Sequence, residues 1–200
     1  MIEYTVKVWW EGRKSWYLNG QRHREDGPAI ELSNGGKSWW FNGQRHRTDG
    51  PAIEYADGGE EWYFEGNRHR VGGPAVIFAD GTKSWWLNGK QHREDGPAIE
   101  YAIGKEWYFS GTKVWCLNGK QHREDGPAVE YYTGDKLWYF NGEIHRTNGP
   151  AIERADGRKF WYLNDKEYTE EDFIKATNPV KELSIAEIEK LLGYQIKVVK

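Results

Sequence analysis

The chain has 200 residues, with 28 Lys and Arg against 31 Asp and Glu, which gives a formal net charge of −3. This balance argues against a polyanion-binding arm or an acidic tail. The single cysteine, Cys116, excludes an intramolecular disulfide and favours a reducing compartment. Leu, Ile, Val and Phe are scarce, but 12 Trp and 12 Tyr, each able to bury about 150–250 Å², predict a core built from aromatic rings.

Residues 1–11 are expected to form an N-terminal capping strand, in which Tyr4, Val6 and Val8 alternate with polar neighbours. Glu3 and Lys7 lie within this apolar stretch, unlike the core of a secretory signal. No stretch of the chain approaches the roughly 18 apolar residues of a membrane span. The expectation is a cytoplasmic protein without a membrane span.

Residues 12–164 repeat one phrase around six histidines, which are spaced by 23, 23, 23, 30 and 23 residues. Residues 19–31 read NGQRHREDGPAIE, and residues 118–130 read NGKQHREDGPAVE. Such self-similarity indicates a repeat architecture. Trp107 and Trp115 are only eight residues apart in the longer gap. We therefore interpret residues 105–111 as a unit that lost its His-Arg-Asp-Gly-Pro half, which gives a truncated repeat near 105–120.

Each unit carries two turn signals. Asn-Gly at 19–20, 42–43, 88–89, 118–119 and 141–142 is a strong two-residue hairpin signal. Asp-Gly or Asn-Gly closes the other end of most units, and the Gly-Pro pair predicts a bend. The segments between the turns are short and rich in aromatic and β-branched residues. The fold class expected is all-β, an elongated antiparallel meander of about seven 23-residue hairpin repeats with a small α-helical C-terminal cap.

Strand alternation sorts the repeated aromatic residues onto two faces. A two-residue Asn-Gly loop pairs Leu18 with Gln21 and Tyr17 with Arg22, so that each histidine opposes a tryptophan. We expect these to form a structural core with stacked indoles, comprising Trp16, Trp39, Trp62, Trp85, Trp107, Trp115, Trp138 and Trp161 with His23, His46, His69, His92, His122 and His145. The other face carries a row predicted to be exposed and partner-binding: Tyr17, Trp40, Tyr63, Trp86, Tyr108 and Cys116.

The histidines are expected to be neutral, packed on tryptophan, and bonded to backbone through one ring nitrogen. A pH switch or a ligand-binding role is the alternative. Metal binding is disfavoured, because equivalent residues lie two strands apart, roughly 9.5 Å, whereas zinc–nitrogen bonds are about 2.1 Å long.

An arginine follows each histidine, and acids recur close behind it. An Arg–carboxylate ladder is the favoured interpretation, and a guanidinium row that grips phosphates or carboxylates is the alternative. The third unit, RHRVGGPAVIFAD at 68–80, has Gly72 and Ile77 where other units have acids. This predicts unpaired cations and a partner site formed by Arg68, Arg70, Val71, Ile77 and Phe78, unless the departure is mere drift.

Residues 165–200 are expected to form a helical C-terminal cap that ends in a short strand. Thr169 with Asp172 predicts a helix start, and Asn178-Pro179 predicts its end. A second helix should begin at Ser184 with Glu187, run to Leu192 and end at Gly193. Residues Tyr194, Ile196 and Val198 then alternate like a strand. A docking module is the alternative to a plain structural cap.

Over about residues 12–164, the phrase NG-x-x-H, a short strand, Asp-Gly and an aromatic strand resembles MORN repeats and their bacterial antitoxin-like relatives. The chain departs from that pattern, because Arg follows His where MORN repeats usually have Gly, and the Gly-Pro-Ala phrase is additional. Arrays of His-Arg-x-Asp-Gly-Pro-Ala are also similar to phage and giant-virus proteins. The resemblance implies an elongated solenoid scaffold, with dimerisation and lipid contact among its uses.

No phosphate-binding glycine loop, HExxH motif or nucleophile elbow occurs in the sequence. The sequence therefore favours a protein that is not an enzyme and has no cofactor and no metal. The leading hypothesis is a scaffold that binds another protein. If the viral resemblance holds, the partner is a host-defence or toxin component in the host cell cytoplasm. The alternative is binding of nucleic acid, nucleotide or carbohydrate on the Tyr/Trp and Arg rows.

Overall fold

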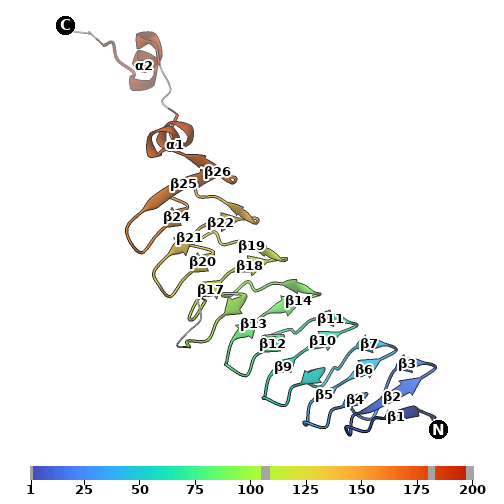
Figure 1. Cartoon of the computed structure of the whole chain (residues 1–200). Coiled ribbons are helices and arrows are strands. Elements are labelled where there is room, and N and C mark those ends of the chain that lie inside the picture. The colour runs from blue at the N-terminus through green and yellow to red at the C-terminus, as the bar shows by residue number, and fades with distance from the viewer. Residues whose placement is uncertain (1, 105–108, 180–182, 197–200) are drawn as a thin grey trace.

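The computed structural model describes residues 2–104, 109–179 and 183–196. Its units follow one another in chain order and form an elongated all-β array (Figure 1). Within the described residues, one antiparallel sheet of 16 strands runs through the array in the order β1-β2-β4-β5-β8-β9-β12-β13-β16-β17-β20-β21-β24-β25-β26, with β3 paired to β2. The predicted all-β meander with a small helical cap is therefore confirmed.

The strands of this main sheet are β1 (Thr5–Val8), β2 (Lys14–Leu18), β3 (Gln21–Arg22), β4 (Ile30–Glu31), β5 (Lys37–Ser38), β8 (Ile53–Glu54), β9 (Glu60–Glu61), β12 (Val76–Ile77), β13 (Lys83–Ser84), β16 (Ile99–Glu100), β17 (Lys113–Val114), β20 (Val129–Glu130), β21 (Lys136–Leu137), β24 (Ile152–Glu153), β25 (Lys159–Leu163) and β26 (Lys166–Tyr168). Five two-stranded hairpins lie beside it in the described part of the chain: β6 (Trp40–Phe41) with β7 (Gln44–Arg45), β10 (Tyr63–Phe64) with β11 (Asn67–Arg68), β14 (Trp86–Leu87) with β15 (Lys90–Gln91), β18 (Cys116–Leu117) with β19 (Lys120–Gln121), and β22 (Tyr139–Phe140) with β23 (Glu143–Ile144).

The two-residue hairpin loops form as predicted. Asn42 has a φ of 48° and Gly43 a φ of 78°, and the other Asn-Gly pairs share this left-handed geometry, which a type I′ turn requires at both positions. The expected register is also confirmed, because Leu18 pairs with Gln21 and Tyr17 pairs with Arg22. Local turn chemistry therefore fixes how each hairpin closes.

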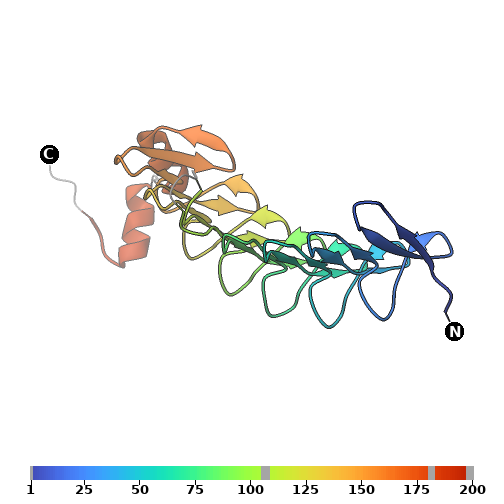
Figure 2. The ribbon, with the colours of Figure 1, turned by 60° about the horizontal axis from the view of Figure 1, so that its bottom comes forward.

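A tryptophan marks the point where the chain passes from the main sheet into a hairpin. Trp39 separates β5 from β6; its N–H donates to the carbonyl of Ala52 at 2.8 Å, and its carbonyl accepts from the N–H of His46 at 3.2 Å. Neighbouring hairpins are joined in turn, since the N–H of Arg24 donates to the carbonyl of Trp40 at 3.1 Å. The result is a row of stacked units with one bend per unit (Figure 2).

The prediction of an aromatic core is wrong. The described tryptophans of the repeat are only half-buried. The alanines after each Gly-Pro are among the most buried positions, with 0 % exposure: Ala29, Ala52, Ala75, Ala98, Ala128 and Ala151. The backbone carbonyl of each alanine accepts a hydrogen bond from the backbone N–H of a tryptophan. The two strands are close together there, and a small side chain fits between them. Ring contacts along the described repeats mostly pair histidine with phenylalanine, and none of those among the described residues joins two indoles, so the expected stack of indoles is not seen there.

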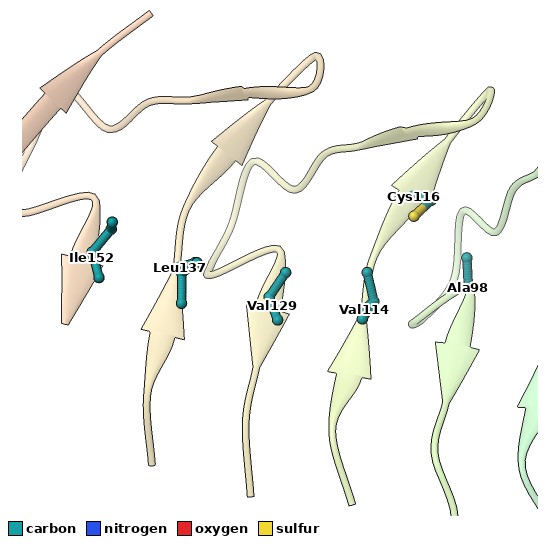
Figure 3. Close-up of a cluster of buried hydrophobic side chains, with 6 residues drawn as sticks. All are labelled: Ala98, Val114, Cys116, Val129, Leu137 and Ile152. Carbon is teal, nitrogen blue, oxygen red and sulfur yellow. The ribbon is translucent and has the colours of Figure 1, made fainter. Parts of the chain in front are cut away.

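Larger apolar side chains are buried mainly in the second half of the array. Val114, Cys116, Val129, Leu137 and Ile152 project from neighbouring strands into one cluster, which also includes Ala98 (Figure 3). This cluster supplies most of the aliphatic core of the described chain.

The long histidine gap is accommodated in one turn. The connection between β16 and β17 spans 101–112, whereas that between β4 and β5 spans 32–36. The strands β16 and β17 still pair directly, so the main sheet continues across this point. The truncated repeat expected near 105–120 is thus an enlarged turn in its described part, followed by the regular strands β17, β18 and β19. Residues 105–108, with Trp107 and Tyr108, lie outside the described residues.

Both ends of the array have caps. The strand β1 pairs with β2 at the N-terminal end. At the other end follow α1 (Glu170–Thr177) and α2 (Ile185–Leu192), which begin at Thr169 and at Ser184 with its capping box, as predicted. The predicted last strand is wrong in its described part, because residues 194–196 are not in a strand, and Val198 lies outside the described residues. None of the helices described is both long and apolar enough to span a membrane.

Candidate functional site

A guanidinium stacked on a tryptophan recurs along the described array. The arginine carbon Cζ lies 3.8–4.2 Å from the indole centroid in the pairs Arg24–Trp16, Arg47–Trp39, Arg70–Trp62, Arg93–Trp85, Arg123–Trp115 and Arg146–Trp138. In each pair Nη1 also donates to the carbonyl of the following proline, at 3.0–3.3 Å. This stack covers each indole with a cation, which explains why the tryptophans are not fully buried by other rings.

Acids complete this arrangement in every unit but the third. In the second unit, Nε of Arg47 donates to Asp49 at 2.9 Å and Nη1 donates to Glu54 at 2.8 Å. The guanidinium hydrogen bond holds the pKa of Asp49 below its ordinary value of 3.8. The sixth unit uses Asn148 in place of the aspartate. The predicted pairing of arginines with acids is confirmed, with each set of partners inside one unit.

The third unit lacks both acids. Arg70 keeps its stack on Trp62 and its hydrogen bond to the carbonyl of Pro74, at 3.0 Å, but forms no ion pair with any described residue. Ile77 stands where the other units have the glutamate. Val71, next to Arg70 in the bend, is 81 % exposed. The structure thus supports an unpaired guanidinium at Arg70, with an exposed apolar neighbour.

Arg68 does not belong to this unpaired site, so that part of the prediction is wrong. Its Nε donates to Glu61 at 2.9 Å, and the hydroxyls of Tyr55 and Tyr63 donate to the same carboxylate at 2.7 and 2.8 Å. Burial alone would raise the pKa of Glu61, which is 5 % exposed, but these hydrogen bonds outweigh burial and hold it below the ordinary value of 4.5. Phe78 is exposed and directly follows β12, which ends at Ile77.

The row predicted to be an exposed partner surface is largely covered. Tyr63 and Cys116 are buried, which corrects that prediction for both, and Tyr17, Trp40 and Trp86 are half-buried. Burial raises the pKa of the Cys116 thiol to about 11, so a reactive thiolate is not present at neutral pH. Tyr108 lies outside the described residues.

The histidines link neighbouring units. The Nδ1 atom of His23 accepts from the backbone N–H of Asn42 at 3.1 Å, and the same contact recurs at His46, His69, His92, His122 and His145. The expected backbone bond is therefore confirmed. The expected packing on tryptophan is wrong, because the His23 ring packs on Phe41 of the next unit, with 4.5 Å between the two ring centroids. No group of three metal-ligating side chains occurs among the described residues.

A pocket of about 310 Å³ in the first two units contains residues that the sequence did not single out. Arg13, Arg22 and Arg45 line it, together with Trp40 and the apolar side chains of Ile30, Leu32 and Ile53. The sequence does contain a signal for this pocket. The hairpin position that is arginine in the first three units, at Arg22, Arg45 and Arg68, is Gln91, Gln121 and Ile144 in the next three. This change along the array distinguishes the first units from the last.

No protein-family model matches the chain, and no curated protein matches it.

Proposed function

We propose that the chain is a non-catalytic repeat scaffold that binds another protein at its third unit, around Arg70. The observation that carries this proposal is the loss of both acid partners from one guanidinium in an otherwise regular ladder. The guanidinium still stacks on Trp62, with its Cζ atom 3.8 Å from the ring centroid, and this contact holds it in place. A carboxylate from a partner would accept from this guanidinium, as the glutamate does in the other units.

The chemistry of the site favours an acidic side chain set in an apolar patch. A charge-assisted hydrogen bond contributes about 1.5–3 kcal/mol when the groups are shielded from water. Val71 and Ile77 replace polar residues beside the guanidinium, so a partner would bury apolar surface in the same contact. In the regular units the arginine already donates to acids of its own unit, so a partner carboxylate would have to displace them.

The experiment uses substitutions that the array itself contains. Ile77→Glu supplies the missing glutamate to Arg70 from inside the chain, and Val71→Glu places the residue found at Glu25 beside it. Both should keep the fold and weaken a captured partner's binding at least tenfold, measured by affinity capture from a bacterial lysate and then by titration. Thr147→Glu, at the equivalent of Val71 in the sixth unit, is the matched control.

Equal binding by the wild type, by Ile77→Glu and by Val71→Glu would show that the third unit has drifted without a role. Salt-sensitive retention of DNA or RNA in place of a protein would favour the nucleic-acid alternative. That the partner is a host-defence or toxin component stays a prediction that rests on the viral resemblance.

A further inference from the structure

The first two units hold three arginines whose charge the described chain does not neutralise. The Nε atoms of Arg13, Arg22 and Arg45 are buried and have no hydrogen-bond partner among the described residues. These residues also form no ion pair there, and their guanidiniums lie over aromatic rings instead. A donor without an acceptor is unfavourable, so the arrangement favours an acceptor from outside the chain.

The three arginines line the same pocket. Its volume is about 310 Å³, and the Cζ atoms of Arg22 and Arg45 each lie 5.1 Å from the ring of Trp40. Lys37 adds a fourth positive charge to the lining. The single carboxylate of the lining, Glu54, already accepts from Arg47 and lies 3.8 Å from Lys37. The pocket is therefore positively charged in a chain whose net charge is negative.

The third unit shows what satisfies this arrangement. Ser38 and Glu61 flank Ile53 at the same register, on either side of β8. Arg45 follows Ser38 by seven residues, as Arg68 follows Glu61. In the third unit the Glu61 carboxylate binds Arg68 at 2.9 Å. In the second unit Ser38 leaves the corresponding space open, beside an arginine that lacks an acceptor.

We propose that this pocket binds a small organic phosphate monoester, with its phosphate at Arg13, Arg22 and Arg45 and its apolar body against Ile30, Leu32 and Ile53. A phosphate carries about −1.5 to −2 charges at pH 7 and three acceptor oxygens, which suits several guanidiniums better than a single carboxylate does. The volume is at the lower end for small-molecule sites. The proposal goes beyond the protein-binding role, and it concerns different residues.

A nucleic-acid strand fits the same residues less well. An extended polyanion would need cations along the whole row, yet Gln91, Gln121 and Ile144 replace the arginine in the units that follow. Within this hairpin row, the described arginines that form no ion pair, Arg22 and Arg45, lie in the first two units. A single phosphate group is therefore the better match.

Isothermal titration of the full chain at low salt would test the proposal, with phenyl phosphate and adenosine monophosphate as probes. At least one of them should bind tenfold or more tightly than inorganic phosphate and benzoate, because neither of the latter combines a dianionic head with an apolar body. Arg22→Gln and Arg45→Gln should each weaken that binding at least tenfold. Glutamine occupies the equivalent position at Gln91 and Gln121, so both variants should fold.

Ser38→Glu gives the sharper test. It would place a carboxylate where the third unit has Glu61, and it should abolish probe binding while raising the urea midpoint. Arg158→Gln, on an exposed turn far along the chain, is the control and should bind as the wild type does. The proposal would be overturned if neither probe bound, or if Arg45→Gln and Ser38→Glu bound as tightly as the wild type. Equal affinity for benzoate would also overturn the choice of phosphate. Failure here would leave the Arg70 proposal intact, because Ile77→Glu and Val71→Glu do not alter this pocket.

Discussion

The two halves of the array use the same backbone unit to build different faces. Along one face of the main sheet, Ser15, Ser38, Glu61 and Ser84 occupy the first half of a row that continues as Val114, Leu137 and Phe160 in the second half. The second half buries an aliphatic cluster there (Figure 3). The first half instead has the hairpin arginines Arg22 and Arg45 over the half-buried ring of Trp40.

This difference shows which parts of the unit determine its shape. The Asn-Gly turns, the buried alanines and the Arg–Trp stacks are shared by both halves. The row between them varies from serine to leucine without a change in strand order. The unit therefore accepts polar or aliphatic side chains in this row without a change in its strand order.

Substitutions in this row should separate the two halves most strongly. Leu137→Ala removes a buried side chain from the aliphatic cluster and should lower the free energy of unfolding by about 2–5 kcal/mol. Ser38→Ala, at the equivalent position of the second unit, removes only the acceptor for the indole N–H of Trp40, so a loss of about 1 kcal/mol or less is expected. Urea unfolding followed by circular dichroism measures both. Equal losses would contradict the division of the array into a second, packed half with the aliphatic cluster and a first, open half with the arginine pocket.

Glu61 is the one acid in the row, and its removal should have the next largest effect. Glu61→Ser introduces the residue that the second unit has at Ser38, and it should lower the free energy of unfolding by about 1.5–3 kcal/mol at pH 7. The pKa of Glu61 lies below its ordinary value of 4.5 in the fold. Its stabilising effect is therefore fully present above that ordinary value and is lost as the pH falls through the lower, folded pKa.

The measurement is the free energy of unfolding against pH for both chains. The difference between wild type and Glu61→Ser should shrink as the pH falls from 4.5 through the lower, folded pKa of Glu61. Glu60→Ser, on the opposite face of β9, is the control. A difference that stayed constant with pH would show that the Glu61 carboxylate contributes by packing alone.

The features that were predictable from sequence are those set by neighbouring residues. The Asn19-Gly20 loop, the pairing of Leu18 with Gln21, and the helix starts at Thr169 and Ser184 all follow from local chemistry. The irregular third unit was also visible, and Arg70 does lack acid partners among the described residues. These properties need no knowledge of how units stack.

The features that were missed depend on contacts across the hairpin or between units. Spacing alone does not show that Arg24 covers Trp16, and for this reason the sequence predicted a core of tryptophans. The pairing of Glu61 with Arg68 crosses a hairpin, and the contact of His23 with Phe41 crosses from one unit to the next. The arginine pocket depends on both kinds of contact.

The smallest effect is expected at the exposed rim of the ladder, which the two halves share. Asp49 accepts from Nε of Arg47 at 2.9 Å, whereas in the sixth unit Asn148 accepts from Arg146 at 3.0 Å. An amide therefore already performs this contact within the array. Asp49→Asn should leave the urea midpoint unchanged within error, because the Asp49 side chain is mostly exposed and its ion pair is screened by water.

The same substitution at Asp125, in the packed half, should give the same result, since its geometry and pKa direction match those of Asp49. Glu54→Gln is the contrasting variant: its carboxylate is about one-third exposed, accepts from Arg47 and lies near Lys37, so it should lower the midpoint. A clear loss at Asp49 but not at Asp125 would mean that the open half depends on its surface ion pairs where the packed half depends on its core.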